Sequence, residues 1–528
     1  MVSVNYQNNV KVVQSSGTNR VQTAPSPVTN PIANVGYQPP AFRNNSYTSI
    51  ATVRTQLVTD SDKKKYKELS AELDMKYRQK LEYALKSGIL LKNDSADKTS
   101  VLDNLYKIFK EPRDPGLDNK TVLKECLDII HNPYVITQTC EDIPEEYKTA
   151  VLGLITNMSE DPNKINAANF DLDNMHTGTC PTASIEFDMA TKHPAEFFRM
   201  VEGLTSPKNE TYKVIDMNAL SDKTLDAVWL LNNFKTPHQK IGFEKAVIQL
   251  KPDKHAIVRA RIQNNHRDKG ERSIIDVLMQ STMMQLGSQQ TYNSLVDKRA
   301  PNSWTQDDSG LIDFEKTYVE SIMENKNTTS VIYQKVDQDG KLAGYEKDFA
   351  TIKKELLDTL ALGHNIIIGY TWPDPQNDNR LAGHEITIVG AKTDKNGETI
   401  FICQDSDDDK DAPIEMKESY LLPKIHHAGL PEEIASKDFS YEDSWKVGVN
   451  EFQAQRANNM QIANSSQVEQ QSPILNQPNQ AQPMQNTTIS MPLWQEKQNA
   501  PQVATNTYTY PVSQMAYQNY SINNRQSA

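Results

Sequence analysis

One stretch of the sequence decides the expected fold, Asn174-Met175-His176-Thr177-Gly178-Thr179-Cys180-Pro181, and it leads straight into a helical pattern over residues 182–203. Proline is favoured at the first position of a helix, because it lacks an N–H group that the first turn leaves unpaired anyway. The unpaired N–H groups and the positive end of the helix dipole favour a thiolate over a thiol. We therefore expect Cys180 to lie in the first turn of a helix and to be poised as a nucleophile.

A second stretch, far downstream, contains the base that a thiolate needs. Residues 383–390 and 399–406 alternate in polarity and are rich in β-branched residues, and Asp394-Lys395-Asn396-Gly397 separates them. Asn-Gly between two such runs is the strongest short signal for a β-hairpin. The pattern predicts a hairpin with His384 at one end of the first strand and Asp405 at the same end of the second. An imidazole and a carboxylate placed in this way can lie side by side.

These residues carry a resemblance to a known family. A Cys at a helix start, then a His that opens one strand, then an Asp or Asn on the next strand resemble the papain-like superfamily of cysteine peptidases, including the bacterial branch similar to the bacteriocin-processing peptidases. Residues 356–369, just upstream of His384, are similar to that family's helix, glycine turn and buried strand. Asn174 stands six residues before Cys180, where the superfamily usually carries the Gln of its oxyanion hole. The resemblance spans residues 166–425.

The resemblance implies an α+β fold in which a helical subdomain with Cys180 faces an antiparallel β subdomain with His384 and Asp405, with the substrate cleft between them. It also implies hydrolysis of peptide or isopeptide bonds in a protein or peptide substrate. His384 takes the proton of Cys180, and Asp405 orients the ring. The backbone N–H of Cys180 and the amide of Asn174 then stabilise the oxyanion, and water hydrolyses the thioester.

Several alternatives stay open at this point. His176 is close enough in sequence to replace Asn174 as the oxyanion donor. Asp407 competes with Asp405, which we prefer because it ends the apolar strand. Transglutaminase-like acyl transfer uses the same chain order of Cys, His and Asp, although Pro181 stands where that branch often has an aromatic residue. A third possibility is a non-catalytic binding scaffold of the same fold.

Composition excludes several classes of function. The 528 residues are 37% hydrophobic and 23% charged, with a net charge of −12, which argues against partners such as nucleic acid or an anionic membrane. The four cysteines show neither a CxxC motif nor paired metal spacing, so we expect a reducing compartment without structural disulfides or zinc. The first residues lack the features of a signal peptide, and no apolar run reaches the ~20 residues of a membrane span. We expect a cytoplasmic protein, with export by a signal-peptide-independent route left open.

No cofactor or metal is expected either. The acidic run over residues 405–411 resembles the start of a calcium loop, but Lys410 stands where the loop requires glycine and Met416 where it requires Glu. The phosphate-binding patterns GxxxxGK[ST] and GxGxxG are both missing from the sequence.

The chain divides into four expected segments. Residues 1–58 are rich in Asn, Gln, Ser, Thr and Pro, and residues 451–528 form a Gln/Asn-rich tail. We expect both ends to be disordered, since they cannot bury enough apolar surface to fold, and the aromatic residues of the tail could dock partners. Residues 59–165 form a helical N-terminal region, and residues 166–450 the papain-like peptidase domain. The helical region could be a pro-segment, a partner-binding module or helices packed against the peptidase core, and we favour the last.

Apolar periodicity assigns the remaining elements. Helices are predicted over residues 60–88, 100–110, 119–130, 145–158, 222–231 and 274–286, the last with a methionine cluster in the core. Strands are predicted over residues 246–250 and 255–262, and a second hairpin over residues 331–345. His193, followed by Pro194, and the pair His426-His427 are expected on the surface.

Overall fold

The computed structural model describes residues 53–139, 143–156, 178–220, 227–268, 270–299, 310–337, 339–408 and 410–435. All of them belong to one unit, residues 1–464. The structure is mixed α+β with antiparallel sheets, as the sequence predicts for the fold class. The predicted tail lies outside the described residues, as does all but the end of the segment 1–58. Within the described residues, every helix is too short or too polar to cross a membrane.

The N-terminal helices begin close to their predicted positions. They are α1 (Asp60–Glu72), α2 (Met75–Lys86), α3 (Val101–Lys110), α4 (Asn119–His131) and α5 (Glu145–Thr156). The single helix predicted over residues 60–88 is therefore wrong, since it is two helices. Asp74 accounts for the break, because its side chain accepts a hydrogen bond from the backbone N–H of Tyr77 and caps α2. Asp is among the best N-cap residues and is weak inside a helix.

One hydrophobic core joins helices α1 to α4 to the Cys180 helix. The helix predicted over residues 182–203 is α6 (Cys180–Lys192) and α7 (Pro194–Leu204), with the break at His193. Buried residues of α3, α4, α6, α7, α10 (Ile274–Gly287) and α11 (Asp313–Glu324) form one contiguous cluster. The methionines of α10 are fully buried in it, as predicted. Helices α1 to α4 thus share a core with α6, whereas Val151 of α5 belongs to a separate, smaller cluster with Ile262 and Leu295.

A small sheet and two helices follow α7. The sheet has the order β1-β3-β2, from β1 (Thr211–Asp216), β2 (His238–Lys240) and β3 (Lys245–Leu250). Helix α8 covers Ala227–Asn233. The strand predicted over residues 255–262 is wrong, because this segment is α9 (Ala256–His266). Its buried residues include Ala256, Arg259, Ala260 and Gln263, spaced as one face of a helix. The buried Arg259 pairs with Asp297, at 2.8 Å.

A six-stranded sheet carries the second half of the predicted site. Its order is β10-β9-β8-β7-β11-β4, and each neighbouring pair is antiparallel. The strands are β4 (Thr328–Ile332), β7 (Ile366–Asp374), β8 (Arg380–Thr393), β9 (Thr399–Gln404), β10 (Ile414–Lys417) and β11 (Ile425–Pro431). The β8–β9 hairpin is the predicted one, with Gly397 at a positive φ of 83° in its turn. The second predicted hairpin pairs β5 (Gln334–Val336) with β6 (Leu342–Tyr345).

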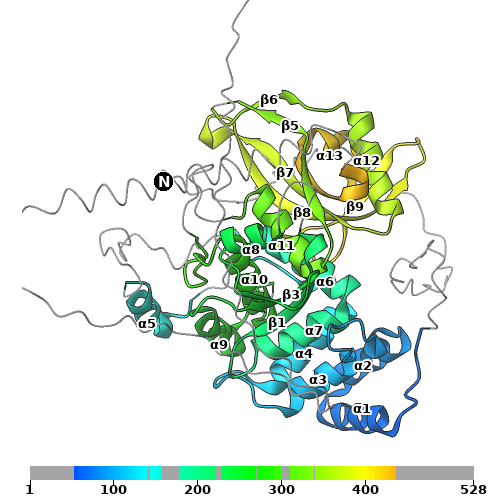
Figure 1. The fold of residues 1–528 in the computed structure, drawn as a ribbon, viewed down its shortest axis with the longest axis vertical. Helices are drawn as coiled ribbons and strands as arrows, with labels where there is room; N and C mark the ends of the chain where they lie inside the picture. The colour runs from blue at the N-terminus through cyan, green and yellow to red at the C-terminus, as the bar shows by residue number, and fades with distance from the viewer. Residues whose placement is uncertain are drawn as a thin grey trace, which may run out of the picture. The chain divides into compact units, whose positions relative to one another are not determined.

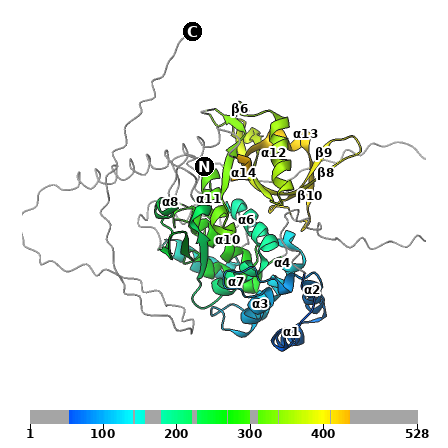
Figure 2. The same ribbon diagram turned by 45° about the vertical axis from the view of Figure 1, so that its right-hand side comes forward.

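Helices cover the six-stranded sheet (Figure 1). Helix α12 (Phe349–Ala361) packs Ile352 and Leu356 against Ile366 and Ile368 of β7, together with residues of β8 and β9, and Figure 2 shows α12 alongside these strands. Two short helices, α13 (Glu418–Leu421) and α14 (Glu432–Ala435), complete this part of the chain. Ile367, between two residues of that cluster, instead packs with the helical core that contains α6. Strand β7 therefore contributes to both cores.

The expected surface position of His427 is wrong. His427 lies in β11, only 6% exposed, and its Nε2 is 2.9 Å from Oε1 of Glu385. Gly369 of β7 makes room for it, because a Cβ atom at that position would lie 2.3 Å from Cε1 of His427. The neighbouring His426 is only partly buried.

Candidate active site

Cys180 begins α6, as the sequence predicts. Thr179 is the N-cap residue, and the backbone N–H of Ala183 donates to its carbonyl at 2.8 Å. Pro181 is in the first turn, where its missing N–H costs nothing. The side chain of Thr179 does not cap the helix, and Cys180 itself is partly exposed. Cys180 is thus a partly exposed cysteine at the start of a helix.

The β8–β9 hairpin brings His384 and Asp405 together. Nε2 of His384 lies 2.7 Å from Oδ1 of Asp405, which directly follows β9. Asp407, the rival carboxylate, is exposed and donates its backbone N–H to Oδ1 of Asp405 at 3.0 Å. The structure therefore places Asp405 against the ring, with the Asp407 backbone supporting it.

Cys180 is near enough to His384 to affect the pKa of its ring through a side-chain hydrogen bond and through charge, so the three residues lie in one region of the fold although they are far apart in sequence. Burial would lower the pKa of His384, but hydrogen bonds to Asp405 and Cys180 and their charges outweigh burial and hold that pKa well above its usual range. Burial likewise raises the pKa of Asp405, yet the hydrogen bond and charge of His384 lower it overall. The surroundings therefore favour the protonated form of the His384 ring.

The ring nitrogens have separate partners. Each nitrogen of an imidazolium carries one proton and can donate one hydrogen bond. Since Nε2 donates to Asp405, Nδ1 is the nitrogen left for the sulfur of Cys180. The side-chain Nε2 of Gln138 lies 3.5 Å from this Nδ1.

Gln138 is the site residue that sequence reasoning missed. It lies on residues 137–139, which we call the bridging segment, far upstream of Cys180. No spacing rule links the two positions, because the chain between them contains α5. The residues predicted for this role, Asn174 and His176, lie outside the described residues.

The bridging segment is bonded to both halves of the molecule. On the sheet side, the backbone N–H of Gln138 and the hydroxyl of Thr137 both donate to the carbonyl of Ser406, at 3.0 and 2.8 Å. On the helical side, the amide of Gln280 in α10 donates to the carbonyl of Thr137 at 2.8 Å. Ser406 follows Asp405 directly, so the segment that carries Gln138 also fixes the carboxylate end of the site.

Two further observations bear on the site, one on metal ligands and one on similarity to known proteins. Among the residues that the structure describes, no group of three or more His, Cys, Asp or Glu side chains is placed to hold a metal ion. The sequence matches no model of a known protein family and no curated protein at a significant level.

Proposed function

We propose that this protein is a papain-like cysteine peptidase that hydrolyses peptide or isopeptide bonds. The observation that supports this most directly is the position of the His384 ring, which lies 2.7 Å from Asp405 and near enough to Cys180 for the two side chains to interact. A nucleophile, a base and a group that orients the base are the three parts of this chemistry. The order of Cys, His and Asp along the chain, on a helix followed by two neighbouring strands, is that of the papain-like superfamily.

In the proposed reaction, Nδ1 of His384 takes the thiol proton of Cys180, and the thiolate attacks the carbonyl carbon of the substrate. Asp405 holds the ring through Nε2 and stabilises the imidazolium. The tetrahedral intermediate collapses when the C–N bond breaks and His384 protonates the leaving amine. Water then attacks the thioester, with His384 as the base, and releases the acid and the free thiol.

The oxyanion of the intermediate needs hydrogen-bond donors in fixed positions. The backbone N–H of Cys180, at the start of α6, is one candidate. We assign the second role to the amide of Gln138, because it lies 3.5 Å from Nδ1 of His384, the ring nitrogen that Asp405 does not use. The bonds to Ser406 and Gln280 hold its backbone, so this donor is positioned before the substrate binds.

Covalent labelling tests the assignment of the nucleophile. A thiol-directed covalent inhibitor should label the wild-type chain once, as read by intact mass. Cys180→Ala should abolish the label and leave the unfolding curve unchanged. Cys126 and Cys403 are fully buried, so they should not react in the folded chain. Cys140→Ser is the matched control and should keep the label.

Undiminished labelling of a folded Cys180→Ala variant would refute the assignment. A peptide library then tests the reaction. We expect cleaved peptides with wild type and none with Cys180→Ala, whereas incorporation of an added amine without cleavage would indicate acyl transfer instead.

A further inference from the structure

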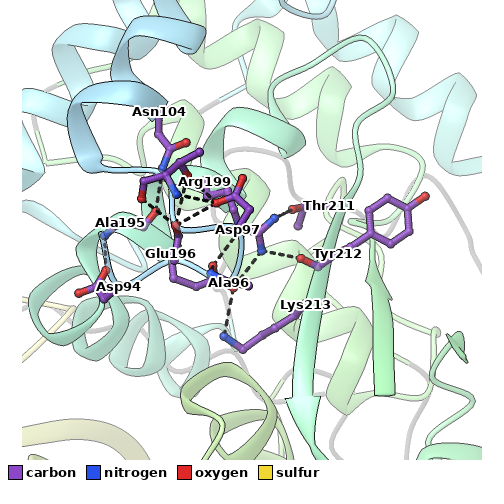
Figure 3. A network of polar contacts seen from close by, with 12 residues as sticks. Asp94, Ala96, Asp97, Asn104, Ala195, Glu196, Arg199, Thr211, Tyr212 and Lys213 are labelled. Carbon is purple, nitrogen blue, oxygen red and sulfur yellow. Dashed lines mark hydrogen bonds and ion pairs between the residues drawn. The ribbon is translucent and has the colours of Figure 1, made fainter. Parts of the chain in front are cut away.

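Lys424, just before β11, lacks the carboxylate partner that other cations of the fold have. In the network of Figure 3, Glu196 accepts hydrogen bonds from Arg199, at 2.8 and 2.9 Å, and from Lys213, at 3.4 Å. Lys424 forms no ion pair with a carboxylate of the described residues, and its Nζ donates instead to the hydroxyl of Tyr370 at 3.2 Å. The positive charge of Lys424 is therefore not balanced by a direct partner.

Two tyrosines complete a cluster around Lys424. The hydroxyl oxygens of Tyr370, on β7, and Tyr420, on α13, lie 2.7 Å apart. Nζ of Lys424 lies 3.9 Å from the centre of the Tyr420 ring. We call Tyr370, Tyr420 and Lys424 the tyrosine–lysine cluster. Tyr420 is 49% exposed and the other two residues are partly exposed, so a ligand can reach the cluster from solvent.

The cluster has more hydrogen-bond donors than it uses. The two hydroxyls carry two protons, and the contact between their oxygens uses one of them. The ammonium group has three N–H donors, of which the two tyrosine oxygens take at most two. At least one O–H and one N–H are thus left for a ligand. A carboxylate suits this set, because it only accepts hydrogen bonds and carries the charge opposite to that of Lys424.

The strand register places the cluster beside His384. Tyr370 pairs directly with His384 between β7 and β8, and the side chains of such a pair lie on the same face of the sheet, with Cβ atoms about 5 Å apart. Asp405 is near as well, since burial, Tyr420 and the charge of Asp405 together raise the pKa of Tyr370. The Asp405 carboxylate lies 2.7 Å from the His384 ring, so its charge is offset before it meets a ligand of the cluster.

We propose that the tyrosine–lysine cluster is a substrate subsite that binds a carboxylate of the peptide near the bond to be cleaved. This inference rests on the proposed function, because nearness to His384 is what makes the peptide substrate the source of the carboxylate. Lys424 and a tyrosine hydroxyl would donate to its oxygens. Asp and Glu side chains carry this group, and so does the free C-terminus of a peptide.

Peptide binding to the full-length Cys180→Ala variant tests the subsite without turnover. The probes are short fluorescent peptides, acetylated and amidated, with one Glu or one Gln at each position in turn. We expect Glu to bind about fivefold more tightly than Gln, or better, at one position at least, because charge-assisted hydrogen bonds are stronger than neutral ones. Gln peptides with a free or an amidated end test the C-terminal carboxylate in the same way. Equal binding within every pair, read by fluorescence anisotropy, would overturn the subsite.

Cleavage by wild type separates this inference from the proposed function. Cleavage of Glu and Gln peptides with equal kcat/KM, together with equal binding, would refute the subsite and keep the peptidase. Tighter binding of the carboxylate peptides to Cys180→Ala, without cleavage of any peptide by wild type, would refute the peptidase and keep the carboxylate site.

Variants made in the Cys180→Ala chain tie the preference to the cluster. Lys424→Met removes the ammonium and should make paired peptides bind alike, whereas Lys395→Met changes an exposed lysine in the β8–β9 turn and should keep the preference. Tyr420→Glu is a second test for the case in which Lys424→Met fails to fold. It places a carboxylate of the chain itself at an exposed position beside Lys424, so it should also abolish the preference. A full preference in folded Lys424→Met or folded Tyr420→Glu would count against the site.

Discussion

His384 and Asp405 are joined by a 2.7 Å contact from Nε2 to Oδ1, and the contact crosses from β8 to the end of β9. The hairpin turn between the two strands is short, so a local element sets this distance. The bridging segment donates two hydrogen bonds to the carbonyl of Ser406, the residue that follows Asp405. The hairpin and the bridging segment thus both fix the position of the Asp405 carboxylate. That carboxylate in turn orients the His384 ring.

Asp405→Asn should move the alkaline limb of the pH profile of kcat/KM to lower pH. The carboxylate helps to hold the pKa of His384 above its usual range, so its loss lowers that pKa and the ring loses its proton at lower pH. We expect kcat/KM to fall about 100-fold or more at neutral pH. Asp407→Asn should leave the limb in place, because Asp407 supports Asp405 through its backbone N–H. If the alkaline limb of the Asp405→Asn profile stays where it is in wild type, Asp405 does not stabilise the His384 imidazolium as we assign.

Gln138→Ala should lower kcat about 100- to 1,000-fold with little change in KM, the loss usual for one oxyanion donor. Alkylation of Cys180 should continue, because the contact between Cys180 and His384 remains. The two measurements together separate a lost donor from a lost nucleophile. Asn174→Ala is the matched comparison. If Asn174→Ala loses this activity and Gln138→Ala keeps it, the donor is Asn174 and our assignment is wrong.

Asp297→Ala should destabilise the helical core by about 3–5 kcal/mol, measured by urea unfolding, because it leaves buried guanidinium groups without their partner. Asp297 is 0% exposed and binds Arg259 at 2.8 Å and Arg272 at 2.9 Å. Exposed Asp268→Ala should change stability by less than about 0.5 kcal/mol. A similar small effect of Asp297→Ala would show that the buried pairs contribute little.

Asp297 should also make the stability of the folded protein depend on pH. Burial would raise the pKa of Asp297, but the charges of Arg272 and Arg259 outweigh burial and lower it to about 2. A carboxylate whose pKa is lower in the folded state stabilises that state above its ordinary pKa and loses this effect as pH falls. The stability difference between wild type and Asp297→Ala should therefore be full near neutral pH and shrink as pH falls toward about 2.

The parts of the site that the sequence predicted are those set by local signals. Pro181 and the apolar spacing after it placed Cys180 at the start of α6. Alternation and the Asn-Gly turn predicted the β8–β9 hairpin and, through its register, the nearness of His384 and Asp405. Such signals act within a few residues, so one sequence is enough to interpret them.

The parts that the sequence did not predict depend on distant partners. The β-branched residues of α9 suggested a strand, whereas the face with Arg259 is buried against Asp297, which is far along the chain. Gln138 reaches the site because Ser406 and Gln280 hold the bridging segment. Local propensity carries no information about such contacts, and tertiary packing routinely overrides it.

Gly369→Ala should destabilise the sheet by about 1–3 kcal/mol, because overpacking a filled core forces side chains or backbone to move. The added Cβ atom would lie 2.3 Å from His427, which pairs with Glu385 beside His384. A double-mutant cycle with His427→Ala tests the cause, since removal of the ring should relieve most of the cost. Gly390→Ala is the control, as its Cβ would meet only Ile402, at 3.8 Å. Additive effects of Gly369→Ala and His427→Ala on the free energy of unfolding would show that this clash is not what the glycine avoids.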